Sequence, residues 1–162
     1  ISLRGDYSDA RNNLGRVLIE AGRFQEAIVH LKIVIQDLKY EYPEKPCVNA
    51  GIAYFNLSDY QSAQNYFIKA IEYQRTNCLA QSYLGRSFYE QKIYTKATEQ
   101  LDKAVTFCKK NQYDEPLYYS ALAYYQLGQK QKTEARLDDV IKMYPNCSYG
   151  DKARNMLEIM KR

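Results

Sequence analysis

Small apolar residues recur along the chain with two fixed spacings. The first spacing separates Gly15, Gly51, Gly85 and Ala121, which follow one another at intervals of 34 to 36 residues. The second spacing is 12 residues, after which each of them is followed by another small residue. The second members are Ala27, Ala63, Ala97 and Thr133. Antiparallel helices pack closely where their side chains are small, so each pair predicts one helical hairpin.

The larger apolar residues between these positions predict where the helices lie. We expect four hairpins at residues 8–21 and 24–40, 45–57 and 60–74, 78–91 and 94–108, and 114–127 and 130–143. A last helix over 149–162 is predicted by an apolar stripe of Ala153, Met156, Leu157 and Met160. The side chains expected to fill the space around the small pairs are Leu14, Tyr54, Phe67, Leu84, Phe88, Leu101, Tyr124 and Leu137.

These helices define an all-α fold in which hairpins stack on one another. A single hairpin cannot bury its own apolar face, so its neighbours must cover it. We therefore predict one domain over 1–162, a superhelix of four hairpin repeats closed by a capping helix. The repeats are placed at about 8–43, 44–77, 78–113 and 114–147, and the capping helix at 149–162.

Composition and charge narrow the functional classes. The net charge of +4 is small and forms no basic stripe, which disfavours nucleic-acid binding. No apolar run reaches the roughly 20 residues of a membrane helix. The one histidine, His30, has no partner at catalytic spacing, and no phosphate-binding loop occurs. We expect no enzyme activity, no catalytic residue, no cofactor and no metal site. The adjacent acids Asp114-Glu115 and Asp138-Asp139 are expected to be solvated.

The four cysteines leave two alternatives open. Cys47, Cys78, Cys108 and Cys147 are 31, 30 and 39 residues apart. Cys47–Cys78 or Cys78–Cys108 could join the start of a hairpin to its end, but not both at once. The alternative is four reduced, partly buried thiols. A disulfide would indicate an oxidising compartment.

The small-residue pattern resembles the tetratricopeptide repeat family over about residues 8–147. The family's early aromatic residue is absent, since Arg11, Cys47, Gln81 and Leu117 occupy that position, and its helix-ending proline is clear only at Pro145. The resemblance implies a concave groove lined by the first helix of each hairpin, which binds a protein or peptide partner. The implied groove residues are Asn12, Arg16, Ile19, Asn49, Ile52, Phe55, Asn56, Ser82, Arg86, Tyr89, Tyr118, Leu122 and Tyr125.

The chemistry of this implied groove suggests what it would bind. Its apolar and aromatic members suit an amphipathic helix or an extended segment, and tyrosine and arginine are frequent at binding hot spots. Alternatively, several of the tyrosines only pack against neighbouring repeats. The clamp with which some family members hold a chaperone's C-terminal carboxylate has comparable positions here at Asn12, Arg16, Asn49, Ser82 and Arg86, although both lysines of that clamp are missing.

Other segments are similar to the pilotin lipoproteins of type IV pili, the PilF/PilW/Tgl group. The similar segments are Tyr42-Pro43, Pro46, Asn49-Ala50-Gly51, Tyr66-Phe67, Ala70-Ile71 and Met143-Tyr144-Pro145. The resemblance implies a periplasmic, outer-membrane-associated factor that assists secretin assembly and has a secretin subunit as its partner, with any lipid anchor outside this chain. The alternatives are a cytoplasmic adaptor or co-chaperone, and a regulatory module of a larger protein.

Overall fold

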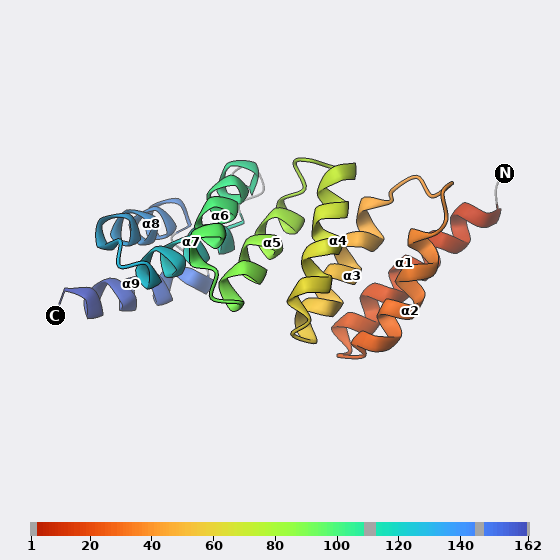
Figure 1. The fold of residues 1–162 in the computed structure, drawn as a ribbon, viewed down its shortest axis with the longest axis horizontal. Helices are drawn as coiled ribbons and strands as arrows, with labels where there is room; N and C mark the ends of the chain where they lie inside the picture. The colour runs from red at the N-terminus through yellow and green to blue at the C-terminus, as the bar shows by residue number, and fades with distance from the viewer. Residues whose placement is uncertain (1–2, 109–112, 145–147, 162) are drawn as a thin grey trace. The chain divides into compact units, whose positions relative to one another are not determined.

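The computed structural model describes residues 3–108, 113–144 and 148–161, and within them the chain is helical with no strand (Figure 1). Along the chain the helices are α1 Leu3–Glu20, α2 Phe24–Ile35, α3 Glu44–Asn56, α4 Tyr60–Tyr73, α5 Cys78–Glu90, α6 Tyr94–Cys108, α7 Glu115–Gln126, α8 Lys130–Met143 and α9 Ser148–Met160. The all-α prediction is confirmed. None of these helices has the length and apolarity that crossing a bilayer requires.

Helix α2 ends at Ile35, five residues before the predicted end. The backbone N–H of Asp37 donates to the Val34 carbonyl and that of Tyr40 to the Asp37 carbonyl, which turns the chain out of the helix. The Asp37 carboxylate accepts a bond from the N–H of Lys39, and the buried Tyr40 hydroxyl donates to Asp9. Side chains that bond the local backbone compete with helical bonds, so these contacts end the helix early.

The helices group into two compact units, Ile1–Tyr83 and Leu84–Arg162. In the first unit α1 packs on α2, α2 on α3 and α3 on α4; in the second, α6 packs on α7, α7 on α8 and α8 on α9. The extent of a single domain over 1–162 stays a prediction, and the units are described separately below.

The small residues hold the helices of each hairpin close together. A Cβ atom added at Gly15, Gly51 or Gly85 would lie 2.6, 2.5 or 2.6 Å from the side chain of Leu31, Phe67 or Leu101. The second members of the pairs, Ala27, Ala63, Ala97 and Thr133, are fully buried. Each glycine thus meets the large residue 16 positions further on, in the second helix of its hairpin, and the contact between the two small residues stays a prediction.

Each hairpin turns at a residue in the left-handed region of backbone space. The φ angles are 74° at Gly22, 60° at Ser58, 61° at Lys92 and 70° at Gly128, and these four residues occupy the same position in their repeats. At Ser58, the N–H donates to the Phe55 carbonyl and the next N–H donates to the Tyr54 carbonyl. This Schellman pattern satisfies carbonyls at the end of a helix.

Of the predicted core residues, Phe67, Leu84, Leu101, Tyr124 and Leu137 are buried, and Tyr54 and Phe88 are partly buried against the core clusters. In the first unit Leu18, Ala27, Ile28, Leu31, Ala50 and Ala53 form a buried cluster; in the second, Leu117, Ala121, Leu137, Val140 and Ala153 do so, with Met156, Leu157 and Met160 of α9 packed against them. The capping stripe is thus confirmed. Leu14, expected in the core, is instead 43% exposed, because no described helix covers that side of α1.

Candidate functional site

The thirteen predicted groove residues lie on the first helices of the hairpins, eight of them in the first unit and five in the second. Asn12 and Ser82 are buried, and so cannot meet a partner directly. The side-chain amide of Asn49 donates a hydrogen bond to Asn12 Oδ1 at 3.0 Å. This bond joins α3 to α1 and holds the Asn12 side chain in place. Arg16 and Asn56 are exposed, while Ile19, Asn49, Ile52 and Phe55 are half-buried.

In the first unit, the aromatic residues near the predicted groove mainly pack against one another. Phe55 meets the edges of Tyr60 and Tyr83, and Tyr83 also stacks on the buried ring of Phe67 at 5.5 Å. Such offset and edge-to-face pairs stabilise a fold by about 0.5–1.5 kcal/mol each. Much of the Phe55 ring is therefore used in contacts within the unit and is not available to a partner.

In the second unit, Arg86 and Glu115 form an ion pair that links α5 to α7. The Arg86 guanidinium also lies over the ring of Tyr119, 4.5 Å from its centre. Glu115, which was expected to be solvated, is only 5% exposed, so that expectation is wrong. Burial raises the pKa of the Glu115 carboxyl, against the opposing effects of Arg86 and of the Tyr149 hydroxyl. Sequence alone gave no signal for this pair, because the residues are 29 positions apart.

Five tyrosines of the second unit form one tyrosine cluster, of which Tyr119 contacts Arg86 and Tyr149 contacts Glu115. Its ring contacts connect Tyr89 to Tyr94 and Tyr119, and Tyr118 and Tyr119 to Tyr149 of α9. Burial raises the pKa of Tyr89, Tyr118 and Tyr119, so these phenols stay neutral at ordinary pH. Sequence analysis assigned α9 to capping alone and so missed the contribution of Tyr149.

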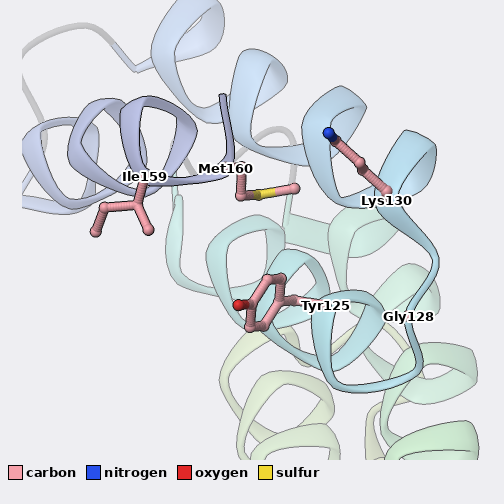
Figure 2. A pocket seen from close by; sticks show the side chains of 5 residues that line it. All are labelled: Tyr125, Gly128, Lys130, Ile159 and Met160. Atoms are coloured by element: carbon pink, nitrogen blue, oxygen red, sulfur yellow. The ribbon is translucent and has the colours of Figure 1, made fainter. Parts of the chain in front are cut away.

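Tyr125, the last of the predicted residues, lines a pocket at the C-terminal end of the second unit. The pocket has a volume of about 250 Å³ and lies between the α7–α8 turn, the start of α8 and the end of α9 (Figure 2). Its lining consists of Tyr125, Gly128, Lys130, Ile159 and Met160. Tyr125 is 48% exposed and Ile159 68% exposed, so apolar area is available at its mouth. The Lys130 ammonium is 3.9 Å from Glu134, and both ends of this pair face solvent.

The remaining predicted residue of α7, Leu122, is half-buried. Together, Tyr125 and the pocket form the part of the predicted site with the most accessible apolar surface in the second unit. Lys130, Ile159 and Met160 were missed, because they lie on second and capping helices, which the family resemblance did not assign to the groove.

The contacts of the two arginines argue against a carboxylate clamp. Arg16 pairs with Glu20 at 2.5 Å, and Arg86 pairs with buried Glu115. A bidentate grip on a carboxylate needs a guanidinium edge that is open to the ligand. The Arg86 guanidinium is already held by the buried Glu115, whereas the Arg16–Glu20 pair is exposed to solvent and weak, so the clamp lacks its second arginine.

The cysteines differ in state. Cys78 and Cys108 are each disulfide-bonded, whereas Cys47 is a buried thiol. The Cys47–Cys78 pairing and the alternative of four reduced thiols are therefore both wrong. Cys147 and Pro145 lie outside the described residues. In the part of the chain that the structure describes, no group of three His, Cys, Asp or Glu side chains could hold a metal ion.

Solved structures of other proteins share this fold. MamA from Desulfovibrio magneticus RS-1 is 25% identical, with a TM-score of 0.75 over 87% of this chain and 77% of MamA. PilW, a type IV pilus biogenesis factor, is 17% identical with a TM-score of 0.81 over 93% of this chain and 67% of PilW. Pseudomonas aeruginosa PilF is 18% identical with a TM-score of 0.74 over 92% and 66%. At these identities PilW and PilF demonstrate similarity of fold alone.

Comparison of sequences gives the same family. None of the curated proteins matches the chain. Three family models, each described as a tetratricopeptide repeat, match residues 8–37, 48–115 and 117–146. These ranges coincide with the hairpins and their contacts of small residues, so the chain belongs to the tetratricopeptide repeat proteins.

Proposed function

We propose that this chain binds a partner protein through the tyrosine cluster and the Tyr125 pocket of its second unit. Tetratricopeptide repeats serve as protein-interaction scaffolds, and their first helices commonly form the binding surface. The observation that carries the proposal is the exposure of Tyr125 and Ile159 at the mouth of a 250 Å³ pocket. Large, partly exposed aromatic residues beside a pocket are typical of binding hot spots.

The lining of the pocket suggests the kind of segment it accepts. A volume of about 250 Å³ suits one or two apolar side chains rather than a drug-sized molecule. Lys130 supplies a cation at the rim, and the Tyr125 hydroxyl can form a hydrogen bond. A short partner segment with an aliphatic or aromatic anchor and a nearby acidic residue has matching chemistry.

For the partner itself we propose a secretin subunit, with this chain acting as a pilotin-like assembly factor. Support comes from the residues shared with the pilotin group and from the similarity of fold to PilW and PilF. The disulfide-bonded Cys78 and Cys108 are in keeping with an oxidising compartment, which favours a periplasmic, outer-membrane-associated location over the cytoplasmic alternative.

The test is a binding measurement with the purified chain as bait and secretin subunits as prey. We expect capture by the unaltered chain and a loss of affinity of about tenfold or more in Tyr125→Ala. The matched control is Tyr73→Ala, because Tyr73 is 52% exposed but lies on α4 in the other unit.

The outcomes separate the site from the partner. Equal capture by Tyr125→Ala would retain the secretin subunit as partner but exclude the pocket. Failure to capture any secretin subunit would exclude the pilotin role. In a parallel arm, binding of a chaperone C-terminal peptide would support the cytoplasmic co-chaperone alternative.

A further inference from the structure

The loop between α2 and α3, residues 36–43, presents the most exposed large apolar side chain in the part of the chain that the structure describes. Leu38 is 97% exposed, whereas the next in order, Ile159, is 68% exposed. The loop has eight residues, twice the four residues 74–77 between α4 and α5, which are all polar. The Leu38 loop, as we call residues 36–43, therefore differs from this later link in both length and polarity.

Hydrogen bonds on both sides of Leu38 hold the Leu38 loop to α1. The Ser8 hydroxyl donates to the Asp37 carboxylate at 2.6 Å, and the buried Tyr40 hydroxyl donates to the Asp9 carboxylate at 2.7 Å. The loop is thus fixed immediately before Leu38 and two residues after it. A partner that binds Leu38 therefore has little loop motion to freeze, which lowers the entropic cost of the contact.

The Tyr125 pocket of the second unit matches Leu38 in size and polarity. Its volume of about 250 Å³ accommodates one or two apolar side chains, and Ile159 and Met160 give it apolar walls. Tyr125 and Ile159 at its mouth are exposed to water, as Leu38 is. Insertion of Leu38 into such a pocket removes apolar surface from water on both sides of the contact.

Among the described residues, the other large apolar side chains that are at least half exposed all lie on helices. They are Tyr7, Val17, Val29, Tyr73 and Ile159. An α-helix with its side chains is about 10–12 Å wide, so it covers a pocket of this size rather than entering it. A loop side chain that is almost fully exposed can enter the pocket, which favours Leu38 over these helical side chains.

Charged residues accompany both surfaces, and their signs are complementary. Lys39 and Glu41 follow Leu38 in the loop and are exposed. At the pocket, the Lys130 ammonium lies 3.9 Å from a carboxylate oxygen of Glu134. The loop therefore brings a cation and an anion to a rim that holds an anion and a cation. Such pairing orients a contact and disfavours wrong partners more than it adds affinity.

We propose that the Leu38 loop of one copy of this chain inserts Leu38 into the Tyr125 pocket of a second copy. The loop belongs to the first unit and the pocket to the second, so each contact leaves one loop and one pocket unused. A contact between two different surfaces adds copies head to tail and yields a ring or a filament. Because the contact fills the pocket, self-association competes with the partner of the proposed function.

The test is the molar mass of the full chain in solution over a range of concentrations, by light scattering or sedimentation. We expect the mass to rise with concentration beyond that of two chains. Leu38→Ser and Tyr125→Ala should each raise the dissociation constant about tenfold or more. An equimolar mixture of the two variants should form a complex of two chains, because one keeps the pocket and the other keeps the loop. The matched control is Ile68→Ser, which should associate as the wild type does, because Ile68 is 45% exposed on α4 outside both surfaces.

Three results would overturn the proposal: a wild-type chain that stays monomeric at every concentration, a Leu38→Ser variant that associates as the wild type does, and a mixture in which the two variants do not pair. Circular dichroism should show unchanged helicity in each variant, since the altered positions are exposed. Capture of a secretin subunit is measured separately. Leu38→Ser keeps the pocket and should capture it at least as well as the wild type, so either proposal can fail while the other stands.

Discussion

At the scale of single residues, three glycines of the first helices leave no room for a Cβ atom. The contact at Gly51 places its α-carbon against the ring of Phe67, which is fully buried. Ala121 in the fourth repeat faces Leu137 in the equivalent contact, so the spacing of the helices there already accommodates a methyl group. The tolerance for a Cβ atom thus differs between repeats.

Gly51→Ala should therefore destabilise the protein although alanine is the better helix former. Overpacking against Phe67 costs about 1–3 kcal/mol, which exceeds the gain of about 1 kcal/mol in helix propensity. Chemical denaturation measures the change. The reverse substitution Ala121→Gly serves as the control and should also destabilise, by removing a packed methyl group. A rise in stability for Gly51→Ala would contradict the close contact.

Cys47 shows how burial controls a side chain's chemistry. Its thiol is fully buried on α3, and this burial raises its pKa to about 11. Only the thiolate is nucleophilic, so burial slows the reaction twice, by blocking the reagent and by disfavouring the thiolate. We expect labelling of Cys47 by a thiol reagent to be slow in the native protein and fast in denaturant. Rapid native labelling would contradict its burial.

At the scale of helices, Asp102 of α6 fastens three helices together. Its carboxylate accepts hydrogen bonds from Ser120 Oγ at 2.8 Å and Tyr124 Oη at 2.6 Å on α7, and from Arg136 Nη2 at 2.8 Å on α8. Burial and the neighbouring carboxylate raise the pKa of Tyr124 to about 12. The hydroxyl therefore contributes stability that is complete below its ordinary pKa near 10 and is lost as pH rises through 12.

Asp102→Asn should lower both the free energy of unfolding and the pKa of Tyr124. We expect a loss of about 2 kcal/mol in the free energy of unfolding, because charge-assisted bonds to a half-buried carboxylate are weakened. The pKa of Tyr124 should fall toward its ordinary value, which ultraviolet titration detects as earlier ionisation. Asp138→Asn is the control, since Asp138 is exposed on α8. A Tyr124 titration that does not change would mean that burial alone sets its pKa.

The helices also show how far sequence reasoning reaches. The 12-residue spacing depends on a contact within each hairpin and so predicts the hairpins correctly. Leu14 was misplaced because its burial depends on what packs against α1 from outside the hairpin. The Arg86–Glu115 pair and Tyr149 were missed because polar contacts between helices follow no short period. The groove positions remain predictions, although Asn12 and Ser82 are buried and so cannot contact a partner directly.

At the scale of the whole molecule, covalent bonds supplement the stacking of hairpins. Cys78 and Cys108 are disulfide-bonded, and removal of a native disulfide from a small domain typically costs 2–5 kcal/mol. We expect a reducing agent to lower the melting temperature of the wild-type chain. Cys47→Ala should keep this sensitivity to reduction, since Cys47 forms no disulfide. Identical melting curves with and without reductant would show that the bond adds little.

The residue with a positive φ angle in each hairpin turn affects how easily its own repeat unfolds. Glycine occupies this conformation without steric cost, but Ser58 and Lys92 adopt it with a side chain, at a cost of about 1 kcal/mol each. Repeat proteins gain stability locally, hairpin by hairpin. Ser58→Gly and Lys92→Gly should therefore each raise the stability of their own hairpin, seen as slower amide hydrogen exchange there. The second and third repeats, which carry this strain, are then the places where thermal opening of the chain is easiest to tune.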